Sequence, residues 1–84
     1  MTQPTTPTIT VYTSGPRCVD CNTIKSWLSQ NGYSFTERNI REDPAALDDL
    51  AQLGYQSVPV TVIGETAIDG LEMDDIKAAL GHQG

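Results

Sequence analysis

The feature that most constrains the fold is a change in hydrophobic period on the two sides of a glycine-proline turn. Residues 8–13, Thr-Ile-Thr-Val-Tyr-Thr, alternate polar and apolar side chains with many β-branched residues, which is typical of a strand with one buried face. After the turn Ser14-Gly-Pro16, apolar residues recur at helical spacing from Cys18 to Leu28, until Asn31-Gly32 ends the pattern. The sequence therefore predicts a strand that leads directly into a helix, with Cys18 in the turn between them.

The middle of the chain predicts a second strand and a second helix. Residues 33–40 are the strand candidate, although Glu37 and Arg38 lie in its middle. Asp43-Pro44 places a capping carboxylate before a proline, whose missing N–H costs nothing at the first helical position. Four apolar residues are expected to form the buried stripe of this helix: Leu47, Leu50, Ala51 and Leu53.

The last third predicts a hairpin and a third helix. The β-rich runs 58–63 and 66–69 flank the two-residue turn Gly64-Glu65, and residues 73–80 favour a helix that ends before Gly81. The crossover helix makes the first two strands parallel, and the tight turn makes the last two antiparallel. We therefore expect an α/β fold of order β-α-β-α-β-β-α, in which a mixed four-stranded sheet is flanked by three helices.

Length and charge exclude several classes of protein. A chain of 84 residues has one modest core, so we expect one domain, residues 8–84, after a flexible N-terminal tail, residues 1–7. The net charge is −6, and residues 43–84 carry eight acidic groups against the single basic Lys77, so we expect no nucleic acid partner. No apolar run is long enough to span a membrane, and the first residues have no secretory pattern. We expect a cytoplasmic monomer with no membrane partner.

The motif Cys18-Val-Asp-Cys21 is the strongest functional signal. Backbone amides at a helix start favour an anion, so Cys18 is expected to ionise readily and to act as the nucleophile. Cys21 lies one helical turn further on, where it can close a disulfide with Cys18 and is the expected resolving thiol. Arg17 favours a thiolate at Cys18, whereas Asp20 opposes it. Such a pair reduces a partner's disulfide in two exchange steps.

The cysteine pair has three other interpretations. A structural disulfide in so tight a ring removes little chain entropy, and the cytoplasm disfavours it. A zinc site within one chain lacks ligands, because the only histidine is His82 near the C-terminus, so we expect no metal site and no tightly bound cofactor. An iron–sulfur cluster bridging two chains is an alternative of another class.

Pro59 is the second informative residue, because proline is unsuited to a central strand. Either the strand begins after it, or the Val58–Pro59 bond is cis and marks a tight turn. A cis bond would leave the backbone N–H and C=O of Val58 available to an extended segment of a partner.

Together these residues resemble the glutaredoxin branch of the thioredoxin fold. The resemblance rests on a strand that ends in Val-Tyr-Thr, the Cys-x-x-Cys motif at the next helix, Val58-Pro59 before a Thr-Val-Ile strand, and Gly70 after the hairpin. It covers about residues 8–80. It implies that Cys18 is the nucleophile, that Cys21 resolves, and that Pro59 is cis.

Within the family the chain is similar to NrdH-type redoxins, which are glutaredoxin-like electron donors. The similar segments are Val19-Asp20, Glu42-Asp-Pro-Ala-Ala46 and Leu53-Gly-Tyr55. This likeness implies that the chain reduces a protein disulfide, with ribonucleotide reductase as a candidate partner, and that thioredoxin reductase is its reductant. The chain has Ile68-Asp-Gly-Leu71 where these redoxins usually carry Trp-Ser-Gly-Phe.

A glutathione-dependent glutaredoxin is the alternative within the same family. Glutathione would then be a co-substrate, with its amino group held by Glu72 or Asp74 beside Gly70 and with Arg17 as the nearby cation. In either case the resemblance marks the same residues for binding a substrate or partner: Arg17, Val58, Pro59 and Gly70.

Overall fold

The computed structural model describes residues 8–81. The predicted tail, residues 1–7, and the last residues, 82–84 with His82, lie outside the described residues. Seven elements follow in the predicted order: β1 (Ile9–Thr13), α1 (Val19–Gln30), β2 (Thr36–Asn39), α2 (Pro44–Gln52), β3 (Val60–Ile63), β4 (Thr66–Asp69) and α3 (Met73–Ala79).

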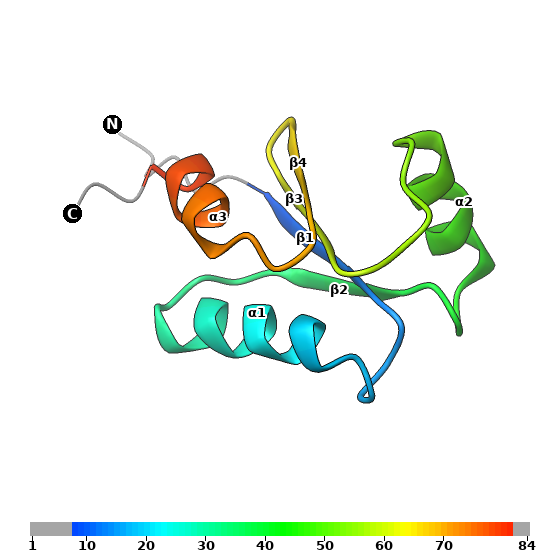
Figure 1. Cartoon of the computed structure of the whole chain (residues 1–84), viewed down its shortest axis with the longest axis horizontal. Helices are drawn as coiled ribbons and strands as arrows, with labels where there is room; N and C mark the ends of the chain where they lie inside the picture. Colours follow the sequence, from blue (N-terminus) through cyan, green and yellow to red (C-terminus); the bar gives the residue numbers. More distant parts are fainter. Residues whose placement is uncertain (1–7, 82–84) are drawn as a thin grey trace, which may run out of the picture.

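The four strands form one mixed sheet in the order β2-β1-β3-β4 (Figure 1). β1 pairs with β2 in parallel and with β3 antiparallel, and β3 pairs with β4 antiparallel. The predicted parallel and antiparallel pairs are therefore confirmed. Because β1 is parallel to β2, the loops that follow these two strands lie at the same end of the sheet, beyond the carboxyl ends of the strands.

The helices cover the two faces of the sheet unequally. α1 and α3 pack on one face against Ile9 and Val11 of β1, whereas α2 packs on the other face against Tyr12. The change of face between Val11 and Tyr12 follows from the period of two along a strand. The domain thus has two small cores, one on each face of the sheet. The three layers of helices and sheet can be followed in Figure 1.

The buried stripe predicted for α2 is wrong in part. Ala46 and Leu50 are fully buried, but Leu47 and Leu53 are 49% and 45% exposed, and Ala51 is exposed as well. The rotation of the helix agrees with its polar contacts, because Arg38 of β2 binds carboxylates at both ends of the helix, Asp43 and Asp49. Residues four apart share one helix face, so Ala46 and Leu50 turn inward together.

Charged side chains of β2 contact the helices on both faces of the sheet. These are Glu37 and Arg38, which are untypical of the middle of a strand. Arg38 faces α2, whereas Glu37 faces α1 and accepts hydrogen bonds from the buried Thr13 hydroxyl at 2.7 Å and from Lys25 at 3.0 Å. The Thr13 hydrogen bond, together with Lys25, holds the pKa of the Glu37 carboxyl below its ordinary value. β2 is therefore an edge strand held by specific polar contacts.

Truncation of Leu50 should cost far more stability than truncation of Leu47. Leu50→Ala leaves a cavity beneath α2 and should lower the free energy of unfolding by about 3 kcal/mol. Leu47→Ala should change it by about 0.5 kcal/mol or less, because half of that side chain is already in water. Urea denaturation of both variants measures the difference. Equal losses would show that the rotation of α2 is not the one described.

Glu37→Gln should destabilise the protein in a pH-dependent way. A carboxyl whose pKa is lowered by folding contributes stability that is present above its unfolded pKa, about 4.3, and is lost as the pH falls through the folded value. The variant should therefore melt at a lower temperature than the natural protein near neutral pH, and the difference should vanish in acid below the ordinary glutamate range. A difference that stays constant with pH would contradict the role of the ionised carboxylate.

Candidate active site

The loop between β1 and α1 is held in one shape by its own backbone. The Cys18 N–H donates to the Gly15 carbonyl at 3.1 Å, and the Asn22 side chain donates to the Pro16 carbonyl at 2.8 Å. Gly15 is buried and has a φ of +111°, a conformation that side chains with a Cβ rarely adopt. The loop therefore delivers Cys18 to the start of α1 in a defined position.

Cys18 is the N-cap residue of α1. Its backbone is extended, and its sulfur accepts a hydrogen bond from the Cys21 N–H at 3.2 Å. A sulfur in this position receives both a hydrogen bond and the positive end of the helix dipole, which favour a thiolate after reduction.

The two cysteines form a disulfide and differ in accessibility. Their Cα atoms lie 5.2 Å apart, within the usual range for a disulfide. Cys21 is fully buried, whereas Cys18 is partly exposed. The arrangement allows an external disulfide to approach Cys18 and leaves Cys21 within bonding reach of Cys18 alone.

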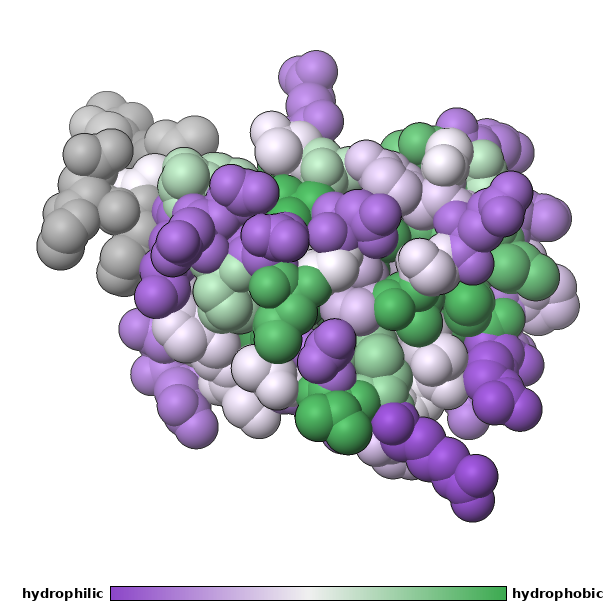
Figure 2. Space-filling model, viewed as in Figure 1, coloured by the Kyte–Doolittle hydropathy of each residue, from purple (hydrophilic) through white to green (hydrophobic). Residues whose placement is uncertain are grey.

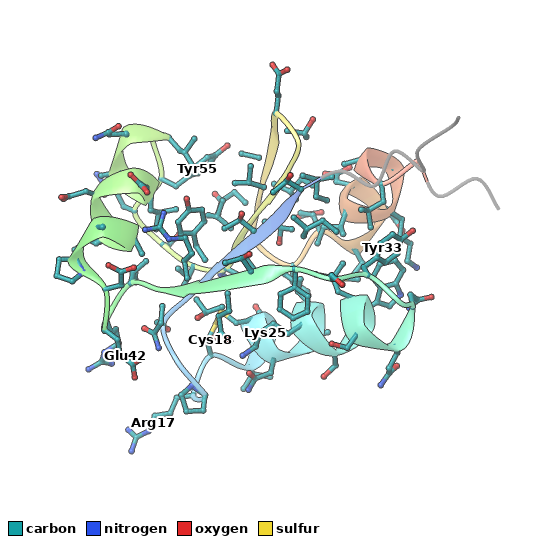
Figure 3. All side chains as sticks on the ribbon, turned by 180° about the vertical axis from the view of Figure 1, so that it is seen from behind. Arg17, Cys18, Lys25, Tyr33, Glu42 and Tyr55 are labelled. Atoms are coloured by element: carbon teal, nitrogen blue, oxygen red, sulfur yellow. A yellow bond between two sulfur atoms is a disulfide. The ribbon has the colours of Figure 1, made fainter. Side chains whose placement is uncertain are left out.

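A cavity of about 700 Å³ opens beside Cys18. It lies where the loops after the parallel strands β1 and β2 meet Val58, at the end of the connection that leads into β3. Figure 3 shows Cys18 and Glu42 on different loops, with Arg17 extending outward at the loop tip. The lining residues are 14–18, Asn39, Arg41, Glu42 and Val58.

Three of these residues were missed by the sequence analysis: Asn39, Arg41 and Glu42. The Asn39 side chain accepts a hydrogen bond from the Arg41 N–H at 2.9 Å and so shapes the turn after β2. The parallel pairing of β1 and β2 was the available signal, because residues after the ends of parallel neighbours meet at one edge of the sheet. The predicted Arg17 lines the cavity, but it is exposed and donates no hydrogen bond to Cys18 in the described structure.

Both interpretations of Pro59 hold at once. The Val58–Pro59 bond is cis, and β3 begins after it, at Val60. Within residues 8–81 no backbone hydrogen bond involves Val58, whereas the Pro59 carbonyl accepts from the Gly70 N–H at 2.9 Å. The structure thus brings Val58 to the cavity and ties Gly70 to Pro59.

Two exposed apolar side chains directly follow predicted site residues in the sequence. Val19, directly after Cys18, is 72% exposed, and Leu71, directly after Gly70, is 40% exposed. Figure 2 shows hydrophobic residues on one face of the molecule, over the start of α1 and over the connection between β4 and α3. Exposed apolar surface beside a reactive residue is suited to contact with a protein.

No group of three or more histidine, cysteine, aspartate or glutamate side chains in residues 8–81 is placed to hold a metal ion. In that same part of the chain, none of the helices has the length and apolar character needed to cross a bilayer.

The fold and the cysteine pair define a dithiol redox domain with a thioredoxin-like fold. The family model for glutaredoxin matches residues 9–68. The chain belongs to the glutaredoxin family.

Comparison with individual proteins gives NrdH-type relatives. The chain is 29% identical over 68 residues to the glutaredoxin-like protein NrdH of Lactococcus lactis subsp. cremoris. The aligned region covers 81% of this chain and 93% of the relative. NrdH-redoxin from Escherichia coli, described as having a thioredoxin-like activity profile, is 30% identical with a TM-score of 0.75, over 83% of this chain and 91% of that one. The thioredoxin-like protein BC3987 is 29% identical with a TM-score of 0.80, over 86% and 99% of the two chains. The predicted family and fold are confirmed, and the Cys-x-x-Cys pair is consistent with a dithiol oxidoreductase.

Proposed function

We propose that the chain is a protein-disulfide reductase in which Cys18 attacks and Cys21 resolves. The observation that carries this proposal is the asymmetry of the pair: Cys18 caps α1 beside an open cavity, and Cys21 is fully buried one turn further on. Only Cys18 can meet the disulfide of another protein without local opening of the domain.

The reaction transfers two electrons in two exchange steps. The thiolate of reduced Cys18 attacks one sulfur of the partner's disulfide, which forms a mixed disulfide and releases the other partner sulfur as a thiolate that takes up a proton. Cys21 then loses its proton and attacks the Cys18 sulfur, which forms the Cys18–Cys21 bond and releases the second partner thiol. The partner gains two electrons and two protons, and an external reductant must restore the dithiol.

The backbone of Val58 is the proposed docking point for the partner chain. The amide and carbonyl of Val58 form no backbone hydrogen bond within residues 8–81, and Val58 lines the cavity beside Cys18. An extended segment next to the partner's disulfide can pair with these two groups. Pro59 and Gly70 support this role by position, since their backbone hydrogen bond holds the turn before β3. Arg17 contributes charge at the rim of the cavity.

Thioredoxin reductase is the proposed reductant, and ribonucleotide reductase is a candidate partner. The support is the likeness to NrdH proteins and the thioredoxin-like activity profile of the Escherichia coli relative. The exposed side chain of Val19, next to Cys18, suits contact with a protein reductant. We propose that the chain works as a monomer in the cytoplasm, with glutathione and a cluster bridging two chains as the alternatives to be tested.

A coupled assay separates these alternatives. NADPH consumption with insulin as disulfide substrate should occur with thioredoxin reductase and should not occur with glutathione and glutathione reductase. Cys18→Ser should reduce the rate to background because the attacking sulfur is lost, whereas Ser29→Ala, an exposed change elsewhere on α1, should leave it unchanged.

Other outcomes of this assay, and a separate anaerobic reconstitution with iron and sulfide, test the alternatives. Turnover with the glutathione system alone would replace the proposal with a glutathione-dependent glutaredoxin. Visible absorbance and bound iron after anaerobic reconstitution would support the cluster alternative. Full turnover by the Cys18→Ser protein would refute the assignment of the nucleophile.

A further inference from the structure

The two edge strands of the sheet, β2 and β4, differ in their polar contacts. At one edge, β2 carries Glu37 and Arg38, which are engaged by charged partners on α1 and α2. At the other edge, β4 pairs with β3 in continuous register from Thr66 to Asp69 and has no lysine, proline or bulge. Such residues and bulges normally prevent the addition of another strand to an exposed edge. β4 therefore lacks these three means of protection, and its one charged residue is the acidic Asp69.

The hydrogen-bonding groups of this edge can be assigned from the ladder. The Gly70 N–H donates to the Pro59 carbonyl across the two strands. Because hydrogen-bonded and free positions alternate along an antiparallel strand, Ile68 and Thr66 also face β3, and Ala67 and Asp69 direct their amides and carbonyls outward. No backbone hydrogen bond within residues 8–81 reaches these outward groups, since β4 has no second neighbour in the sheet.

Space for a further chain lies next to this edge. A groove of about 460 Å³ runs between β4 and the flank of α3. Its strand wall is residues 66–69, and its helix wall includes the small side chains Ala78 and Ala79. The groove begins at Asp69, next to Gly70 and thus next to the turn at Pro59.

The charge of the groove defines the chemistry of its occupant. Asp69, Glu72 and Asp75 line it, and none of the three has an ion-pair partner in the described part of the chain. Lys77 of α3 does not compensate them, because its ammonium lies over the Trp27 ring on the side of α1, 5.6 Å from the ring centroid. In Figure 2 hydrophilic residues gather over α3. A second copy of this chain would bring the same carboxylates together, which disfavours pairing of two β4 edges.

We propose that the groove between β4 and α3 docks an extended basic segment of a partner protein, which adds to the sheet as a strand beside β4. Main-chain hydrogen bonds to Ala67 and Asp69 supply the pairing, and lysine or arginine side chains of the segment meet Glu72 and Asp75. The proposal goes beyond the exchange of disulfides at Cys18 and does not depend on it. A partner that carries both a basic strand and a disulfide would be held here while exchange takes place at the cavity.

The test uses a probe without cysteine, so that its result is independent of the thiol chemistry. The oxidised protein, labelled with ¹⁵N, is titrated with a short capped peptide of alternating lysine and valine. The expected result is saturable shifts of the Ala67 and Asp69 amide signals. A peptide of alternating glutamate and valine, and a lysine-valine peptide with alternate backbone nitrogens methylated, should not bind.

Matched charge reversals identify the groove. Asp75→Lys should weaken binding of the lysine-valine peptide by about fivefold or more, because it removes one exposed ion pair and adds repulsion. Asp48→Lys, an exposed reversal on α2, should weaken it less than that. Asp75→Asn, which keeps the side-chain shape, should give an intermediate loss, and the amide spectrum of each variant shows whether it is folded.

Four results would overturn the proposal. The first is the absence of shifts at Ala67 and Asp69. The second is equal weakening by the two charge reversals, which would show attraction to the overall negative charge alone. The third is equal binding of the methylated peptide, which would exclude strand addition. The fourth is a concentration-dependent shift of the same amides without peptide, which would show that a second copy occupies the edge.

Discussion

The structure depends on the junction at which β1 ends and α1 begins. Gly15 lets the backbone turn sharply there, and the Cys18 N–H closes the turn onto the Gly15 carbonyl. The same turn makes Cys18 the cap of α1, so one sulfur both satisfies a helix amide and faces the cavity. The burial of Cys21 then follows from helix geometry, since the next turn of α1 packs against the sheet. The chemistry of the pair is therefore a consequence of how this strand meets this helix.

Most of the fold could be predicted because local signals and hydrophobic period agree along the chain. The cap at Asp43-Pro44 and the turn Gly64-Glu65 occur where they were expected, since each is determined by a few neighbouring residues. The buried face of α2 could not be predicted in full, because the contacts of Arg38 with Asp43 and Asp49 are polar contacts between two elements, which the hydrophobic period of the helix does not report. Hydrophobicity alone favoured Leu47 and Leu53, which the structure exposes.

The candidate site shows the same division between local and long-range information. Cys18 and Cys21 are close in sequence, so their pairing at a helix start is a local property. Arg41 and Glu42 reach the cavity because β2 lies parallel to β1. The crossover helix predicts that pairing, but the position of these two residues follows only when the strands are assembled into the sheet. At Val58-Pro59 the two alternatives were not exclusive: the bond is cis and the strand also begins after it.

The central claim is that Cys18 attacks and Cys21 resolves, and trapping of the mixed disulfide tests it most directly. Cys21→Ser and Cys18→Ser proteins, each reduced and then mixed with a disulfide-containing protein near neutral pH, can be compared by mass spectrometry. The account predicts that the Cys21→Ser protein accumulates a covalent adduct through Cys18, because no second thiol can release it. It also predicts that the Cys18→Ser protein forms little adduct, because Cys21 is buried. Adduct formation by the Cys18→Ser protein at an equal or greater rate would contradict the account.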